Sequence, residues 1–157
     1  MTKNLMTSVS GIRGIVGQSL TPETIIKYVS AFGQRNAGKK VVVGGDPRVS
    51  SYFMRPLILG TLQACGCEVI DVGIAPTPTI EIAVKTLQAA GAIAITASHN
   101  PIEWNGLKFI GPDGMFLPER EIFDLFREAD KRKRAYASWD KLGNVEQYDN
   151  AVEIIWL

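Results

Sequence analysis

The stretch KVVVGG, residues 40–45, predicts the fold because it is a short β-branched run without polar alternation. Strands that are apolar on both faces are typical of a parallel sheet covered by helices on both sides. Two further stretches have the same character: CEVIDVG, residues 67–73, and AGAIAITA, residues 90–97. These three segments predict a sheet with a buried centre.

Helical segments separate these strands. The first begins with Thr21, a favoured N-cap residue, and Pro22, which fits the first position of a helix. The predicted helices cover residues 21–37, residues 51–64, residues 77–87 and a segment that begins at Pro118. The turn Pro112-Asp113-Gly114 predicts a hairpin that adds an antiparallel edge strand. We therefore predict an α/β fold, a three-layer α/β/α sandwich with a mixed, mostly parallel sheet.

Composition and charge exclude several function classes. The chain has 157 residues, of which 46% are apolar and 21% charged, which is typical of a globular domain. Its 17 Lys and Arg residues nearly balance its 16 Asp and Glu residues, so no strong field attracts nucleic acid or an anionic membrane. No apolar run reaches the roughly 18–20 residues of a membrane span, and the first residues lack the apolar core of a signal peptide. We expect a cytoplasmic protein with neither nucleic acid nor membrane as partner.

Two local features have ordinary structural explanations. Cys65 and Cys67 have no second pair of thiols with which to complete a metal site, and they lie at the start of a predicted strand. We interpret them as small apolar residues. The basic run 131–134 follows a predicted helix, where cations complement the helix dipole.

Four polar or glycine-marked loops contain the residues suited to chemistry. They are SGIRGIVG (10–17), GGDPRVSS (44–51), TASHNP (96–101) and NGLK (105–108). Positive charge, hydroxyl groups and free backbone amides at the carboxyl edge of a sheet suit a phosphorylated ligand. Taken alone, two of these loops have a simpler explanation. The first can be a set of glycine turns, and the second can contain an Asp46–Arg48 pair that stabilises a turn.

Ser98 directly follows a buried strand and lies beside His99, the single histidine of the chain. A serine hydrolase needs a histidine within hydrogen-bond reach of the hydroxyl and a carboxylate behind that histidine. Side chains of adjacent residues usually point apart, and the sequence has no G-x-S-x-G elbow. Hydrolase chemistry is therefore disfavoured.

The string TASHNP, from Thr96 to Pro101, resembles the phosphoserine loop of the α-D-phosphohexomutases, the family of phosphoglucomutase, phosphomannomutase and phosphoglucosamine mutase. Three other segments resemble parts of this family in the same order. SGIRG (10–14) is similar to its N-terminal arginine loop, VGGDPR (43–48) to its G-x-D-x-R segment, and NGLK (105–108) to the segment after the serine loop. The four motifs span about residues 8–118 and resemble the first of the family's four domains.

The resemblance implies that Ser98 carries a phosphoryl group and gives it to the free hydroxyl of a hexose monophosphate. The resulting bisphosphate then returns its other phosphate, so that hexose 1-phosphate and hexose 6-phosphate interconvert. Arg13 would be a cation beside the transferred group, Lys108 would shuttle the proton, and His99 is a second candidate for that role. The residues expected to bind the phosphate or support the loop around it are Asn100, Arg48 and Asp46.

The resemblance also implies Mg²⁺, which in the family bridges the phosphoserine and a D-G-D-x-D cluster in a second domain. This sequence has no such cluster. Ser98, through its phosphate, would thus be the metal ligand of this chain, and we expect no tightly bound cofactor in it alone. The expected partners are a hexose phosphate, a hexose bisphosphate and the other domains of the same longer chain.

We accordingly expect a piece of a longer mutase that is inactive by itself. Residues 1–135 would form domain I with the phosphoserine loop, and residues 136–157 an exit linker and the start of the second domain. Glucose, mannose and glucosamine phosphates stay open as substrates. The alternative is a non-catalytic phosphate- or nucleotide-binding α/β module.

The C-terminal tail has a cluster of large apolar side chains that would pack on the second domain in a whole family enzyme. They are Val152, Ile154, Ile155, Trp156 and Leu157. We expect this tail to pack either on its own domain or on a neighbouring copy, as an exchanged element. The second case would be a dimer caused by truncation.

Overall fold

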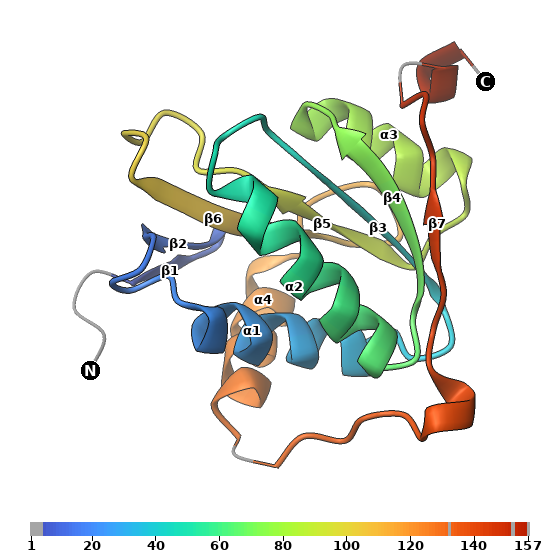
Figure 1. The fold of residues 1–157 in the computed structure, drawn as a ribbon, viewed down its shortest axis with the longest axis horizontal. Helices are drawn as coiled ribbons and strands as arrows, with labels where there is room; N and C mark the ends of the chain where they lie inside the picture. The colour runs from blue at the N-terminus through green and yellow to red at the C-terminus, as the bar shows by residue number, and fades with distance from the viewer. Residues whose placement is uncertain (1–4, 132, 152, 157) are drawn as a thin grey trace.

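The computed structural model describes residues 5–131, 133–151 and 153–156. Its strands are β1 (Met6–Ser8), β2 (Gly11–Ile15), β3 (Lys40–Gly45), β4 (Glu68–Ile74), β5 (Gly91–Ile95), β6 (Trp104–Ile110) and β7 (Val145–Gln147). They form one sheet in the order β1-β2-β6-β5-β3-β4-β7 (Figure 1). Its helices are α1 (Pro22–Arg35), α2 (Ser51–Ala64), α3 (Thr77–Thr86) and α4 (Glu119–Asp130), with short 3-10 helices η1 (Trp139–Lys141) and η2 (Glu153–Trp156).

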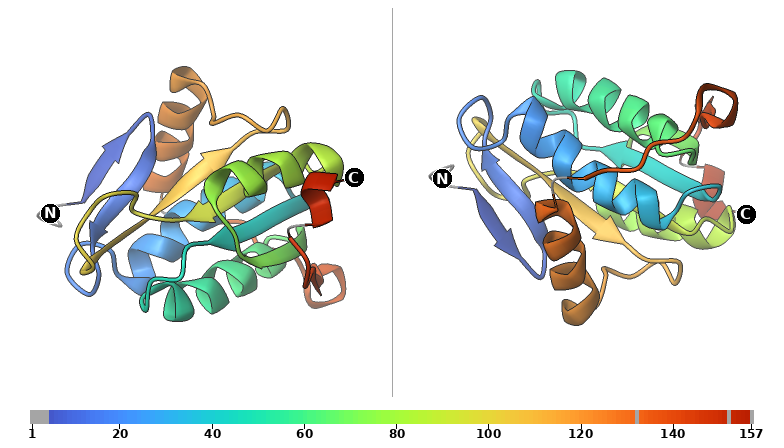
Figure 2. Two further views of the ribbon diagram at one scale, coloured as in Figure 1. Left: turned by 90° about the horizontal axis from the view of Figure 1, so that it is seen from above. Right: turned by 90° about the horizontal axis from the view of Figure 1, so that it is seen from below.

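The sheet has two halves of different character. In the parallel half, which comprises β5, β3, β4 and β7, neighbouring strands run in the same direction. In the antiparallel half, β1 pairs with β2 and β2 with β6. The antiparallel pairing of β6 with β5 joins the two halves. Figure 2 shows the β1–β2 hairpin at one end of the molecule and the C-terminal segment at the other.

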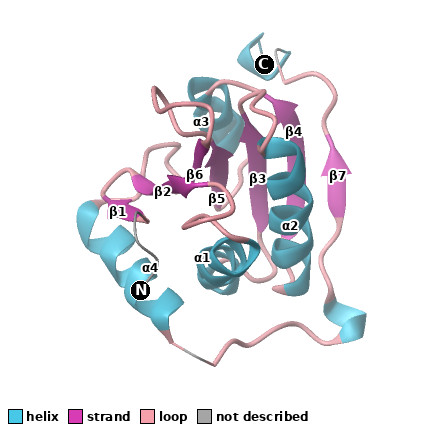
Figure 3. Ribbon diagram, turned by 60° about the vertical axis from the view of Figure 1, so that its left-hand side comes forward, coloured by secondary structure: helices cyan, strands magenta, loops and turns pink. Residues whose placement is uncertain are grey.

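Helices cover both faces of the sheet, as the three-layer prediction requires. α1, α2 and α4 lie on one face (Figure 3), where they pack on alternate side chains such as Val41 and Val43. α3 and η2 cover the other face, where Val42 belongs to a second apolar cluster. The alternation follows from the two-residue period of a strand. The described residues include no helix with both the length and the hydropathy that a membrane span requires.

The α/β class, the mixed sheet and the helix positions are confirmed. Thr21 caps α1 as expected, since its Oγ1 accepts a hydrogen bond from the Thr24 amide at 3.3 Å. The proportion of parallel pairing is smaller than expected, because three pairings are parallel (β3–β4, β3–β5 and β4–β7) and three antiparallel (β1–β2, β2–β6 and β5–β6).

Two expectations about the antiparallel strands were wrong. The glycine-rich segment 10–17 contains β2 rather than only turns, and β6 lies inside the sheet rather than at its edge. The turn at 112–114 does reverse the chain, but its second arm makes only an isolated bridge between Ile110 and Phe116. β2 occupies the edge of β6 instead and makes β6 an interior strand.

The C-terminal segment returns to the sheet. β7 pairs with β4, so residues within the predicted exit linker extend the parallel half. Ala151 and Ile154 are buried against the cluster around α3, whereas Ile155 is exposed. Packing of the tail on its own domain is thus confirmed for Ile154. Val152 and Leu157, and the side chain of Trp156, lie outside the described part of the chain.

Candidate functional site

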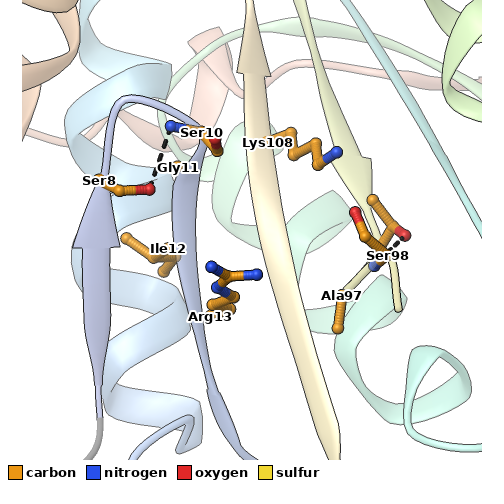
Figure 4. Close-up of a pocket in the computed structure, with 9 residues that line it drawn as sticks. Ser8, Ser10, Gly11, Ile12, Arg13, Ala97, Ser98 and Lys108 are labelled. Carbon is orange, nitrogen blue, oxygen red and sulfur yellow. Dashed lines mark hydrogen bonds between the residues drawn. The ribbon is translucent and has the colours of Figure 1, made fainter. Parts of the chain in front are cut away.

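A pocket lies where the antiparallel half meets the loop after β5 (Figure 4). It measures ≈ 80 Å³ and is lined by Ser8, Ser10, Gly11, Ile12, Arg13, Thr96, Ala97, Ser98 and Lys108. Its charged lining residues are two cations, Arg13 and Lys108, and the described lining contains no carboxylate. Because two cations and several hydroxyl groups converge without a competing acid, the pocket suits an anion such as a phosphate.

Ser98 occupies the tip of the loop that leaves β5. Its backbone has φ of 55°, the left-handed region that residues other than glycine rarely adopt. The Thr96 hydroxyl accepts a hydrogen bond from the Ser98 amide at 3.1 Å, and the Asn100 amide donates to the Ala97 carbonyl at 3.1 Å. These turn contacts leave the Ser98 side chain exposed at the pocket. Unusual backbone of this kind clusters at functional sites.

Arg13 reaches the same pocket from β2, a strand that the sequence analysis did not predict. It is paired with Gly106 of β6, and its Nη1 donates to the Asn100 Oδ1 at 3.1 Å. A Cβ at Gly106 would lie 2.4 Å from the Ile12 carbonyl oxygen and 3.0 Å from that of Thr96. Glycine at 106 therefore permits the close approach that brings β2 and the serine loop together.

Lys108 comes from β6, where it is paired with Ala94 of β5. Its side chain is half-buried, and its Nζ lies 5.3 Å from the centre of the Phe116 ring, a cation–π contact. Figure 4 shows the amine extending from β6 toward the serine loop. The structure thus brings together Ser98, Arg13 and Lys108, three residues from three separate sequence motifs.

His99 does not line this pocket. It opens into a neighbouring pocket of ≈ 300 Å³ that shares Ser98 and Thr96 with the first and includes Asp46. Since the two pockets share Ser98, His99 stays within the same region of the surface. Its place is beside Asp46 rather than beside Arg13 and Lys108.

Asp46 and Arg48 support the serine loop from behind. The Arg48 guanidinium donates to backbone carbonyls of the loop, including that of Asn100 at 2.8 Å. Asp46 accepts hydrogen bonds from the Arg48 amide and the Ser51 hydroxyl. Asn100 contacts Arg13. These contacts give all three residues supporting positions around the loop.

The sequence analysis missed several residues of this region. Ser8 lines the pocket, Thr96 closes the turn, and the fully buried Asn105 donates to the hydroxyls of Ser50 and Ser51. Asn105 thereby ties β6 to the start of α2. Thr96 and Asn105 could have been found from the sequence, because they belong to the strings TASHNP (96–101) and NGLK (105–108). Nothing in the sequence distinguished Ser8.

The two thiols are confirmed as structural. Cys65 and Cys67 are free and buried, and burial raises their pKa values, to about 11 for Cys65 and about 12 for Cys67. Both are therefore neutral thiols near pH 7. Within the described residues, no group of three or more His, Cys, Asp or Glu side chains is placed to hold a metal ion.

Comparisons with known proteins agree with this geometry. The family model described as phosphoglucomutase/phosphomannomutase, alpha/beta/alpha domain I, matches residues 5–135. The chain is 42% identical over 147 residues to a phosphoglucomutase/phosphomannomutase of Thermococcus kodakarensis, covering 88% of this chain and 32% of that protein. It is 43% identical over 120 residues to a phosphoglucosamine/phosphogalactosamine mutase of Sulfurisphaera tokodaii, covering 74% of this chain and 26% of that protein.

A similar solved structure is that of a Thermus thermophilus protein assigned to the phosphomannomutases. It aligns with a TM-score of 0.81 at 28% identity, over 96% of this chain and 34% of that one. The chain thus spans about 32% of the length of the curated relatives that it matches first. Because the domain I model matches most of its length, the chain belongs to the phosphoglucomutase/phosphomannomutase family.

Proposed function

We propose that this chain is the phosphate-carrying domain of a phosphohexomutase that interconverts hexose 1-phosphate and hexose 6-phosphate through a phosphoserine and a hexose bisphosphate. The observation that carries the proposal is the shared pocket of Ser98, Arg13 and Lys108. Phosphoryl transfer depends on positioning and on fixed cations around the equatorial oxygens of the transferred group. An exposed hydroxyl that shares a pocket with two cations provides such an arrangement.

Each residue then has a defined task. In the first step the bond from phosphorus to the Ser98 Oγ breaks as the sugar hydroxyl oxygen bonds to phosphorus, and the hydroxyl proton passes to a base. In the second step the Ser98 Oγ attacks the other phosphate of the bisphosphate, which releases the isomeric monophosphate. Arg13 stabilises charge on the transferred group. Lys108 is the favoured proton shuttle because it lines the same pocket, and His99 is the second candidate.

The proposed substrate class is a hexose phosphate, since the names of the relatives include glucose, mannose, glucosamine and galactosamine mutases. The donors of this chain do not fit Mg²⁺ by themselves, because the described pocket lining has no carboxylate. Mg²⁺ sites in proteins usually combine one or two carboxylates with substrate phosphate. We expect titration of the unphosphorylated chain with Mg²⁺ to show no micromolar binding; such binding would reveal a different metal site.

Intact-mass measurement tests the phosphoserine directly. After incubation of the full-length mutase that contains this chain with a hexose 1,6-bisphosphate, we expect the protein to gain the mass of one phosphoryl group, to lose it on phosphatase treatment, and to carry it on Ser98. The Ser98→Ala variant should gain nothing, whereas Ser138→Ala, at an exposed serine distant from the pocket, should behave as the unaltered chain. Phosphate binding without covalent uptake would favour the non-catalytic binding module instead.

A further inference from the structure

The Arg48 guanidinium donates four hydrogen bonds to backbone carbonyls and forms an ion pair with Asp46. Its Nη1 donates to the carbonyls of Pro101 at 2.7 Å and Trp104 at 2.9 Å, and its Nη2 to those of Ser98 at 3.2 Å and Asn100 at 2.8 Å. Its Nε faces the Asp46 Oδ2 at 3.4 Å. A guanidinium has five N–H donors; four of those of Arg48 are used on backbone carbonyls, and the fifth, on Nε, faces the Asp46 carboxylate rather than the pocket that Arg13 and Lys108 line. Its partners are the backbone of the serine loop.

Arg48 is itself held in place from two directions. The Asp46 Oδ1 accepts hydrogen bonds from the Arg48 amide at 3.1 Å and from the Ser51 hydroxyl at 3.2 Å. That hydroxyl accepts in turn from the buried Asn105 of β6 at 3.1 Å. The Arg48 side chain is only 16% exposed. The Asp46 carboxylate that faces the guanidinium is therefore tied to Ser51 of α2 and, through that hydroxyl, to Asn105 of β6.

The loop that Arg48 holds connects Ser98 with Arg13. Arg48 binds the carbonyl of Ser98, the residue with the left-handed backbone, and the carbonyl of Asn100. The Asn100 side chain then accepts from the Arg13 Nη1 at 3.1 Å. Contacts thus run without interruption from Arg48 through the backbone of the loop and the amide of Asn100 to Arg13.

We propose that Arg48 is a positioning residue, which holds the Ser98 loop in its left-handed turn and, through Asn100, directs Arg13 into the phosphate pocket. The proposal rests on the proposed function and assigns Arg48 to the geometry of the loop rather than to the phosphate. Charge alone does not suffice for this role. Lysine retains the charge but donates from one atom, so it cannot span four carbonyls.

The decisive variant is Arg48→Lys, with Arg55→Lys as its matched control. Arg55 is a similarly shielded arginine of α2, with its side chain 23% exposed, and it pairs with Asp71 away from the loop. In Arg48→Lys we expect hydrogen exchange of the Asn100 and Trp104 amides to be about tenfold faster, because two or more loop anchors are lost. We also expect the Arg13 Nε and Asn100 Nδ2 NMR signals to move, and the affinity for inorganic phosphate to fall about tenfold. Arg55→Lys should change none of these.

A second variant covers the case in which Arg48→Lys does not fold. Asn100→Ala keeps the anchors of Arg48 on the backbone, so it should move the Arg13 signal and weaken phosphate binding while exchange at Trp104 stays unchanged. Unchanged exchange in Arg48→Lys would overturn the proposal, and so would altered exchange with an unmoved Arg13 signal. All readouts use the unphosphorylated chain and inorganic phosphate. Failure of Ser98 to accept a phosphoryl group would count against the proposed function alone.

Discussion

The two halves of the sheet contribute different parts of the site. The parallel half ends in the loops that hold Ser98 and Arg48, whereas the antiparallel half supplies the cations Arg13 and Lys108 from within strands. Loops at the carboxyl ends of parallel strands commonly bind ligands, and here such a loop faces side chains of an antiparallel extension. The Ser98 hydroxyl and the two cations thus come from different parts of the sheet, so their relative placement depends on how the two halves pack together.

The largest expected effect concerns the cations of the antiparallel half. In the full-length mutase, Arg13→Ala removes a charge-stabilising donor and Lys108→Met removes the proposed proton shuttle. Each should slow phosphoryl transfer between Ser98 and a hexose phosphate by about a hundredfold to a thousandfold. The free energy of unfolding should change by less than about 1 kcal/mol, because both side chains are half-buried and line an open pocket. Single-turnover kinetics and urea unfolding measure the two quantities.

Thr7→Ala, at an exposed position in the same half, is the control. Near-normal transfer in both variants would remove the antiparallel half from the reaction.

The next effect concerns the contact between the halves. Gly106→Ala should lower the free energy of unfolding by more than about 2 kcal/mol, since the new Cβ would meet two backbone carbonyl oxygens. Gly60→Ala is the matched control: a Cβ there meets nothing within 4 Å, and alanine in a helix should stabilise by about 0.5–1 kcal/mol. Urea unfolding compares them. Equal stability of the two variants would show that β2 and the serine loop can separate without cost.

A third measurement concerns the far edge of the parallel half. Ile154→Ala should lower the free energy of unfolding by about 2–4 kcal/mol, because Ile154 is 1% exposed in the cluster around α3. Ile155→Ala, at a position 46% exposed, should lower the free energy of unfolding far less. Sedimentation of the chain with and without residues 148–157 should give the same oligomeric state if the tail packs on its own domain. A dimer that disappears on truncation would support the exchanged tail instead.

The smallest effect concerns the buried thiols of the parallel half. Burial raises the pKa of Cys65 to about 11 and that of Cys67 to about 12, whereas an unfolded thiol ionises near pH 8.5. The folded state therefore binds more protons than the unfolded state above about pH 8.5, so stability falls as the pH rises from there toward 11 or 12. A Cys65→Ala, Cys67→Ala double variant should show a flatter decline in denaturant titrations. Rapid modification of both thiols in the folded chain at pH 8 would contradict the burial.

The parallel half could be predicted from the sequence because its signals are local. KVVVGG is β3 at the predicted bounds, and residues 51–64 are α2 as predicted. An unbroken β-branched run and a helical segment between turn residues each indicate their structure within a few residues. The strings around Ser98, Arg13 and Lys108 likewise indicated a phosphate site before any geometry was known.

The antiparallel half could not be predicted in the same way. β2 is a glycine-rich strand without apolar alternation, and it exists through its pairing with β6, about 90 residues further along the chain. One strand of the parallel half shares this limitation: β7 is three residues long and pairs with β4 at the edge of the sheet. Strand propensity reports how well a residue fits its neighbours, so a strand defined by distant partners leaves little local signal.

The sequence by itself therefore determined the α/β class, the central strands and the helices, and it singled out Ser98, Arg13 and Lys108, which the structure brings to one pocket. Periodicity, capping and polar loop residues are local properties. The tertiary structure alone decided that Arg13 extends from a strand and that His99 lines a neighbouring pocket. It also decided that Arg48 donates its hydrogen bonds to backbone carbonyls in and next to the serine loop. These outcomes depend on which distant segments meet. Contacts between distant segments are set by packing and hydrogen bonding across the sheet, which no short window of sequence contains.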